Sequence, residues 1–136
     1  MIIYVDENLS PYLSKGLQIL QYPENSKLRE PIEVRSIKEE FGSGAQDEDW
    51  IPAAGKKNSC ILTQDYKIHR IKHQQVLCIQ YKLGMFYFRP PCKNGFLYWD
   101  MVKLVVKHWQ EVTKIAVSEK RPFAFQITSK SRIVQL

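Results

Sequence analysis

The stretches IIYVDENL (residues 2–9) and SCILTQD (residues 59–65) decide the fold class, because each contains a short apolar run that leads to an aspartate. Such runs are typical of strands that are buried on both faces of a parallel sheet. After the first run, Ser10 and Pro11 predict the start of a helix, since serine caps helices and proline fits their first position. Four leucines recur at helical spacing and predict one buried stripe: Leu9, Leu13, Leu17 and Leu20.

The rest of the chain alternates predicted strands with predicted helices. A polar loop is expected at 22–31, strands at 32–37, 59–63 and 76–81, helices at 47–55, 66–73 and 97–116, and a terminal hairpin from 123–128 and 133–136. This order predicts an α/β fold with a central, mainly parallel sheet, helices on both faces and a C-terminal β-hairpin. The aromatic run MFYF at 85–88 lies outside these elements. We interpret it as core or a strand extension, with a partner surface as the alternative.

Length and composition are those of an ordinary globular domain. The 136 residues predict a single domain over 1–136, and the chain has neither a signal-peptide pattern nor an apolar run of roughly 18 residues. We therefore expect a soluble, cytoplasmic protein without a membrane partner. The three cysteines form no C-x-x-C pair, so neither a disulfide framework nor a zinc site is predicted. Several residues are interpreted as packing residues only: Cys60, Cys78, Cys92, Trp99 and Trp109.

Charge is distributed unevenly along the chain. Residues 1–50 hold 10 acidic and 5 basic residues, whereas residues 51–136 hold 4 acidic and 15 basic residues. A basic surface attracts polyanions or acidic partners over long distances. A solvated lysine-rich face is the alternative interpretation, so the charge by itself leaves the partner open.

Three aspartates from separate segments are predicted to meet at one edge of the sheet. Asp6 follows the first strand, Asp65 follows the strand at 59–63, and Asp47 begins the helix that leads into that strand. In parallel sheets the carboxyl ends of the strands form the ligand-binding edge. Carboxylates that crowd together repel unless a cation neutralises them, and Mg²⁺ prefers oxygen ligands. Taken singly, each aspartate could instead be a helix cap; taken together, they favour a metal site.

At these residues the sequence resembles the PIN-like domains, in the branch that contains the VapC-type toxin nucleases. The resemblance rests on Val5–Leu9, Gly44–Glu48 and Leu62–Asp65, and it extends over nearly the whole chain through the order of elements. It implies a three-layer α/β/α fold. It also implies a Mg²⁺- or Mn²⁺-dependent endoribonuclease that hydrolyses RNA to a 5′-phosphate and a 3′-hydroxyl, often as the toxin of a type II toxin–antitoxin pair.

The same resemblance implies roles for individual residues. Asp6, Asp47 and Asp65 would be the catalytic residues and the metal ligands, and the supporting residues would be Glu7, Asn8, Asp49 and Thr63. Many family members read T-x-D-x-D-F after the third strand, but here Lys67 and Ile68 stand where the second aspartate and the phenylalanine would be. The missing fourth acid would weaken metal binding, unless Glu7 or Asp49 takes its place.

A basic segment follows Asp65 directly. We expect four of its residues to bind RNA phosphates: Lys67, His69, Arg70 and Lys72. Tyr66 would stack on a base of single-stranded or structured RNA. A solvated basic helix face is the alternative interpretation of this charge run. An antitoxin protein and a second copy of the chain are the further partners that the toxin function implies.

Other classes of function fit the sequence less well. A receiver domain would share the acidic pair Asp6 and Glu7, but it needs a flexible loop where the basic segment follows Asp65. A phosphatase with a D-x-D nucleophile is excluded because Asn8 holds the third position. The remaining alternative is a catalytically inactive PIN-like module that binds RNA or a protein partner, and Lys67 is the feature that supports it.

Overall fold

The computed structural model describes residues 1–64, 68–130 and 132–136. Within the second range, side chains are described from residue 72 onward. One six-stranded sheet runs in the order β2-β1-β3-β4-β5-β6. Its strands are β1 (Ile2–Val5), β2 (Glu33–Ser36), β3 (Ser59–Gln64), β4 (Gly84–Arg89), β5 (Phe123–Thr128) and β6 (Ile133–Gln135). The first five strands are parallel, and β6 pairs antiparallel with β5. The predicted mainly parallel sheet and terminal hairpin are confirmed.

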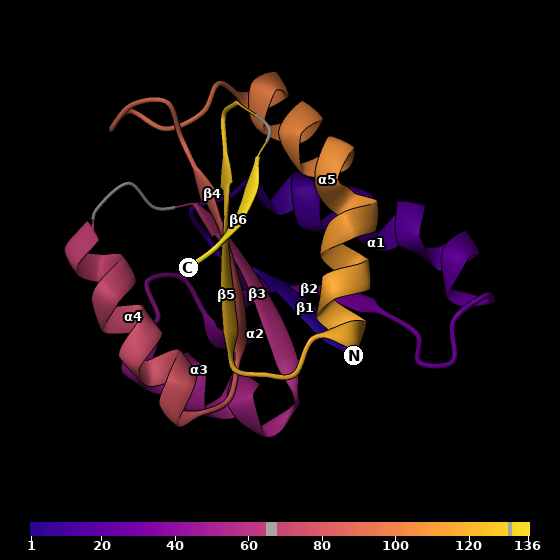
Figure 1. Cartoon of the computed structure of the whole chain (residues 1–136), viewed down its shortest axis with the longest axis horizontal. Helices are drawn as coiled ribbons and strands as arrows, with labels where there is room; N and C mark the ends of the chain where they lie inside the picture. The colour runs from indigo at the N-terminus through magenta and orange to yellow at the C-terminus, as the bar shows by residue number, and fades with distance from the viewer. Residues whose placement is uncertain (65–67, 131) are drawn as a thin grey trace.

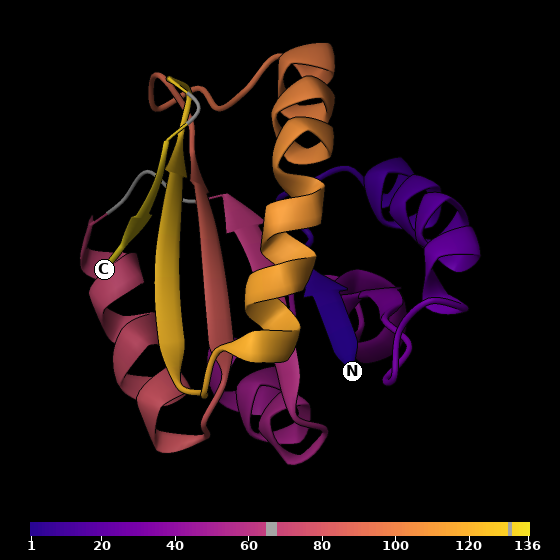
Figure 2. The same ribbon diagram turned by 45° about the vertical axis from the view of Figure 1, so that its right-hand side comes forward.

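Helices cover both faces of the sheet. The elements are α1 (Pro11–Asn25), α2 (Ile37–Phe41), α3 (Asp47–Lys56), α4 (Ile68–Gln80) and α5 (Tyr98–Ser118). Figure 1 and Figure 2 show α1 and α5 on one face and α3 and α4 on the other. Two hydrophobic clusters correspond to these faces, one with side chains of α1 and α5 and the other with side chains of α2, α3 and α4. The three-layer arrangement is therefore confirmed.

Alternate residues of the central strands feed the two clusters. In β1, Ile3 belongs to the cluster under α1 and α5, while Tyr4 belongs to the cluster on the opposite face. In β4, Phe86 belongs to the cluster under α1 and α5, and Tyr87 belongs to the cluster on the opposite face. Because side chains of a strand alternate between faces, a strand covered on both sides is apolar throughout. This burial explains the continuous apolar runs in the sequence.

Helix α1 begins where the sequence predicts. The Tyr12 backbone N–H donates to Ser10 Oγ across 3.2 Å, and Pro11 is the first helical residue. Leu20 is 62% exposed, so the predicted stripe ends before it. The polar loop expected from residue 22 begins later, because α1 continues through Pro23 to Asn25. Asn25 then donates to the Ile32 carbonyl across 2.9 Å and accepts from its N–H across 3.0 Å, which fixes the approach to β2.

The strand predicted at 76–81 is wrong, because these residues complete and follow helix α4. The run VLCI buries Cys78 but leaves Val76 and Ile79 exposed, which is the pattern of one helix face. A short apolar run does not distinguish a strand from a helix by itself. The fourth strand is instead β4, so MFYF is core and its partner-surface alternative is wrong.

Two of the proposed packing residues are also corrected. Cys92 is exposed, and the Trp99 side chain is 67% exposed on the first turn of α5. Trp109 does pack, and its Nε1 donates to the buried Gln21 Oε1 across 2.9 Å. Among the described residues, no helix is both long and apolar enough to span a membrane.

Candidate active site

The carboxyl ends of the parallel strands lie at the edge shown at the top of Figure 1. The register aligns Val5 of β1 with Leu62 of β3, and Gln64 of β3 with Phe88 of β4. Residues that follow β1 and β3 therefore share this edge. The loop from β4 to α5 and the turn of the terminal hairpin lie at the same edge (Figure 1).

Asp6 is held directly beyond the end of β1. Its backbone N–H donates to the Leu62 carbonyl across 2.9 Å, so the pairing with β3 continues to this residue. Its side chain is almost completely buried; Oδ2 accepts from the Thr63 hydroxyl across 2.7 Å and Oδ1 from the Glu7 backbone N–H across 2.8 Å. Hydrogen bonds to a carboxylate are short and strong, so two of them fix its orientation.

Asn8 connects this carboxylate to the end of β3. Its Nδ2 donates to Thr63 Oγ1 across 3.1 Å and to the Gln64 carbonyl, while its Oδ1 accepts from the Gln64 N–H across 3.2 Å. The Gln64 side chain in turn donates from Nε2 to the Asn8 carbonyl. Asn8 thus supplies a donor to the same hydroxyl that donates to Asp6. The structure places Asn8 and Thr63 beside Asp6, where the sequence expected supporting residues.

The loop before α3 is joined to the end of β1 by Glu7. The Gly44 N–H donates to Glu7 Oε2 across 3.0 Å, and Gly44 has a φ of +72°, which favours glycine. This contact brings the segment that leads to Asp47 toward the residue next to Asp6. The Glu7 carboxylate therefore binds the loop before α3 in this structure.

Asp47 begins α3 and faces α4. The N-cap is Gln46, so Asp47 is the first helical residue and the capping alternative is wrong. Its Oδ2 accepts from Nε2 of the fully buried Gln74 across 3.4 Å. Two residues along a helix rotate by about 200°, so Asp49 points away from the side of the helix that carries Asp47. Asp49 is exposed.

Glu48 forms the second contact between α3 and α4. Its Oε1 lies 2.9 Å from His73 Nε2 at the surface. Its own backbone N–H, and then His73, hold the pKa of Glu48 below its ordinary value. With the Asp47–Gln74 hydrogen bond, this pair fixes how the start of α3 lies against α4. His73 is thereby placed in a structural contact.

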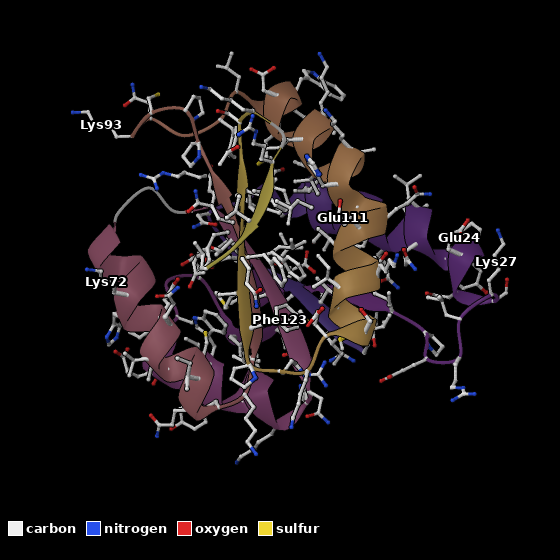
Figure 3. The ribbon with its side chains drawn as sticks, viewed as in Figure 1. Glu24, Lys27, Lys72, Lys93, Glu111 and Phe123 are labelled. Atoms are coloured by element: carbon white, nitrogen blue, oxygen red, sulfur yellow. The ribbon has the colours of Figure 1, made fainter. Side chains whose placement is uncertain are left out.

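Several predicted site residues lie outside the part of the chain that can be described. Asp65, Tyr66 and Lys67 follow β3 directly, and the side chains of His69 and Arg70 are likewise outside the description. Lys72 is exposed on α4, as Figure 3 shows. Over residues 1–64, 68–130 and 132–136, the histidine, cysteine and acidic residues form no group of three placed to hold a metal ion. Asp6 and Asp47 are the two predicted ligands within these ranges.

Sequence reasoning missed two glutamines of the site. Gln64 ends β3 and exchanges hydrogen bonds with Asn8, and Gln74 is buried against Asp47. A polar residue on the buried face of an amphipathic helix is a usable signal for Gln74, since it lies four residues before the buried Cys78. Because residues 76–81 were expected to form a strand, Gln74 was not placed on the buried face of a helix.

The fold and this edge define an open α/β protein whose polar side chains gather where the parallel strands end. The family of the PIN like domain matches residues 1–90, which is more than half of the chain. The chain therefore belongs to the PIN-like domain family, a nuclease-type family. No curated protein and no solved structure matches the chain. Residues 91–136, with α5 and the terminal hairpin, follow the matched range.

Proposed function

We propose that this PIN-like domain is a Mg²⁺- or Mn²⁺-dependent endoribonuclease, and that it acts in the cytoplasm as the toxin of a type II toxin–antitoxin pair. The observation that carries the proposal is the Asp6 carboxylate, which is buried at the end of β1 and oriented by Thr63 and the Glu7 N–H. Burial of a carboxylate is costly, so the presence of a buried carboxylate at a ligand-binding edge supports a chemical role.

The residues present fit a hard divalent ion. Asp6 and Asp47 supply carboxylate oxygens, and Asp65 follows Gln64 directly, so the predicted ligands are oxygens only. The Glu7–Gly44 hydrogen bond brings the segment before Asp47 toward the end of β1. Asp6, Asp47 and Asp65 would hold the ion. When bound, it would activate water and neutralise charge at a phosphodiester.

The protein contributes orientation and attraction of the substrate. Thr63 and the Glu7 N–H hold the Asp6 side chain in one orientation, and Asn8 donates to the Thr63 hydroxyl, so little reorganisation is needed when the substrate binds. The basic half of the chain attracts the phosphate backbone of RNA. In the proposed reaction a water oxygen bonds to phosphorus and the P–O3′ bond breaks. The products are a 5′-phosphate and a 3′-hydroxyl.

A catalytically inactive PIN-like module that binds RNA or a protein partner is the second candidate. Lys67 stands where many family members have an acid. Glu7 is engaged with Gly44, and Asp49 points away from the side of α3 that carries Asp47, so neither is arranged as a replacement. This candidate predicts binding without cleavage.

The test is cleavage of a pool of single-stranded RNAs with Mg²⁺ or Mn²⁺. Asp6→Asn and Asp65→Asn should each lose metal-dependent cleavage, because each removes a carboxylate ligand. Glu24→Gln is the charge-matched control, since Glu24 is exposed near the end of α1 and pairs only weakly with Lys27 across 3.4 Å (Figure 3). Wild-type protein that neither cleaves RNA nor gains thermal stability with metal would contradict the nuclease and leave the binding module.

The toxin assignment has a separate test. A toxin of this type requires an antitoxin encoded nearby, and a homodimer is the assembly that we expect for the toxin itself. Expression of the chain alone should arrest growth, and co-expression with the neighbouring small protein should restore it. Growth that is unaffected by a catalytically active chain would contradict the toxin assignment but not the nuclease activity.

A further inference from the structure

A cavity of about 590 Å³ opens beside the carboxyl edge, on the side of α5. It lies between the loop from β4 to α5, the first turns of α5 and the turn between β5 and β6. We call it the α5 cavity and define it by six of its lining residues: Pro91, Phe96, Lys103, Leu104, Lys107 and Ser129. All six follow the range that matches the family. The basic segment expected to bind RNA precedes and enters α4 instead.

The α5 cavity adjoins the candidate active site at Gln64. A Cβ atom placed on Gly95, which also lines the cavity, would lie 3.6 Å from Gln64 Oε1. Gln64 exchanges hydrogen bonds with Asn8, and Asn8 donates to the hydroxyl that holds Asp6. A strand of RNA that crosses Asp6 can therefore continue over Gln64 and Gly95 into the cavity.

The lining of the cavity combines apolar surface with two lysines and one aspartate, Asp100, so its net charge is positive. Phe96 and Leu104 supply an apolar floor, while Lys103 and Lys107 are exposed and one helical turn apart on α5. Two like charges at this spacing destabilise a helix slightly, and Asp100 on the preceding turn offsets this only in part. A ligand with a flat apolar part and an anionic part complements such a lining. The volume of the α5 cavity also lies within the usual range for small-ligand sites.

We propose that the α5 cavity binds one unpaired nucleotide of the RNA substrate, next to the nucleotide whose phosphodiester lies at Asp6. The base packs against Phe96 and Leu104, and Lys103 and Lys107 bind the adjacent phosphates. The inference rests on the proposed function, because that function supplies RNA as the substrate. It gives the domain a preference for single-stranded RNA, since a paired base is not available to enter the cavity.

The first test measures binding without cleavage. A fluorescent single-stranded RNA is titrated with the protein in EDTA, and binding is followed by anisotropy. The double variant Lys103→Gln/Lys107→Gln should weaken binding on the order of tenfold at low salt and reduce the slope of log K against log salt by about 1.4. The double variant Lys114→Gln/Lys120→Gln has the same net charge and should match the wild type, since both lysines are exposed outside the cavity lining. Equal losses in both variants would overturn the proposal.

The second test uses the exposed thiol in the lining. Cys92 lines the α5 cavity, whereas Cys60 and Cys78 are buried and burial raises the pKa of each to about 12. A maleimide at about pH 7 should therefore modify Cys92 selectively, because thiolates react and thiols do not. Saturating single-stranded RNA should slow this modification, and an RNA duplex should not. Modification at the unprotected rate in the single-strand complex, or equal protection by the duplex, would overturn the proposal.

The two tests separate this inference from the proposed function. If the wild-type protein fails to cleave RNA, but RNA protects its Cys92 and the Lys103→Gln/Lys107→Gln variant shows the reduced salt slope, the nuclease is wrong and the nucleotide site stands. If the Lys103→Gln/Lys107→Gln variant cleaves with an unchanged KM and RNA leaves Cys92 unprotected, the nuclease stands and the nucleotide site is wrong.

Discussion

The Thr63 hydroxyl donates to Asp6 Oδ2 across 2.7 Å, so a side chain of β3 holds the carboxylate that follows β1. Asn8 Nδ2 approaches the same hydroxyl to 3.1 Å as a donor. Because a hydroxyl has one proton and can also accept, Thr63 can receive the hydrogen bond of Asn8 while it donates to Asp6. The relay gives Thr63, the first residue of the T-x-D sequence at the end of β3, a direct contact with the first aspartate.

Replacing Thr63 by valine tests this relay. Thr63→Val keeps the shape of the side chain but leaves the buried Asp6 carboxylate without that donor. We expect the free energy of unfolding to fall by about 1–3 kcal/mol, measured by urea denaturation. Thr63→Ser retains the hydroxyl and should recover most of the loss that comes from the hydrogen bond. Equal stability of the valine and serine variants would show that Thr63 acts by packing alone.

Gln74 is expected to matter for metal binding. Gln74→Met keeps the length of this buried side chain but removes its hydrogen bond to Asp47, so the carboxylate loses an orienting partner. Loss of such a partner typically weakens metal affinity by about 10–100-fold. The affinity for Mn²⁺ can be measured by electron paramagnetic resonance. Gln75→Met, one residue further along α4, is the control and should bind Mn²⁺ like the wild type.

Two glycines should respond in opposite directions to alanine. A Cβ on Gly84 would lie 2.3 Å from the Phe123 ring, so Gly84→Ala should lower the free energy of unfolding by about 1–3 kcal/mol. Gly16 lies inside α1 with nothing within 4 Å of its Cβ position, so Gly16→Ala should raise it by about 0.5–1 kcal/mol. Urea denaturation of both variants measures the contrast. Rescue of Gly84→Ala by Phe123→Leu would confirm that the ring causes the loss.

Stability at high pH should depend on Tyr4. Burial, and then the neighbouring Glu40, raise the pKa of Tyr4 well above its ordinary value. Above about pH 10 the unfolded chain loses this phenolic proton while the folded chain keeps it, so stability falls as pH rises. Tyr4→Phe should reduce the loss of unfolding free energy between about pH 8 and pH 11, measured with urea. Tyr12→Phe, at an exposed tyrosine, should behave like the wild type.

Local patterns predicted much of the fold. Ser10 and Pro11 marked the start of α1, the apolar run at 2–5 marked β1, and the periodicity over 97–116 marked α5. These signals are local because capping, proline geometry and amphipathic spacing act within a few residues. The run at 76–79 failed because four apolar residues fit a helix face and a strand equally well. The fourth strand was instead set by tertiary pairing, because β3 and β5 pair with residues 84–89 from both sides.

The sequence by itself determined the class of fold, the strands that end in polar residues and the identity of Asp6 and Asp47 as candidates. Chain order and hydrophobic spacing are sufficient for this, because they fix which segments can enter a parallel sheet. Only the tertiary structure decided that Thr63 holds Asp6, that Asn8 donates to Thr63, that Gln74 holds Asp47, and that the α5 cavity adjoins Gln64. These relationships join residues more than 25 positions apart. They depend on the register of strands and the packing of helices, which no local pattern encodes.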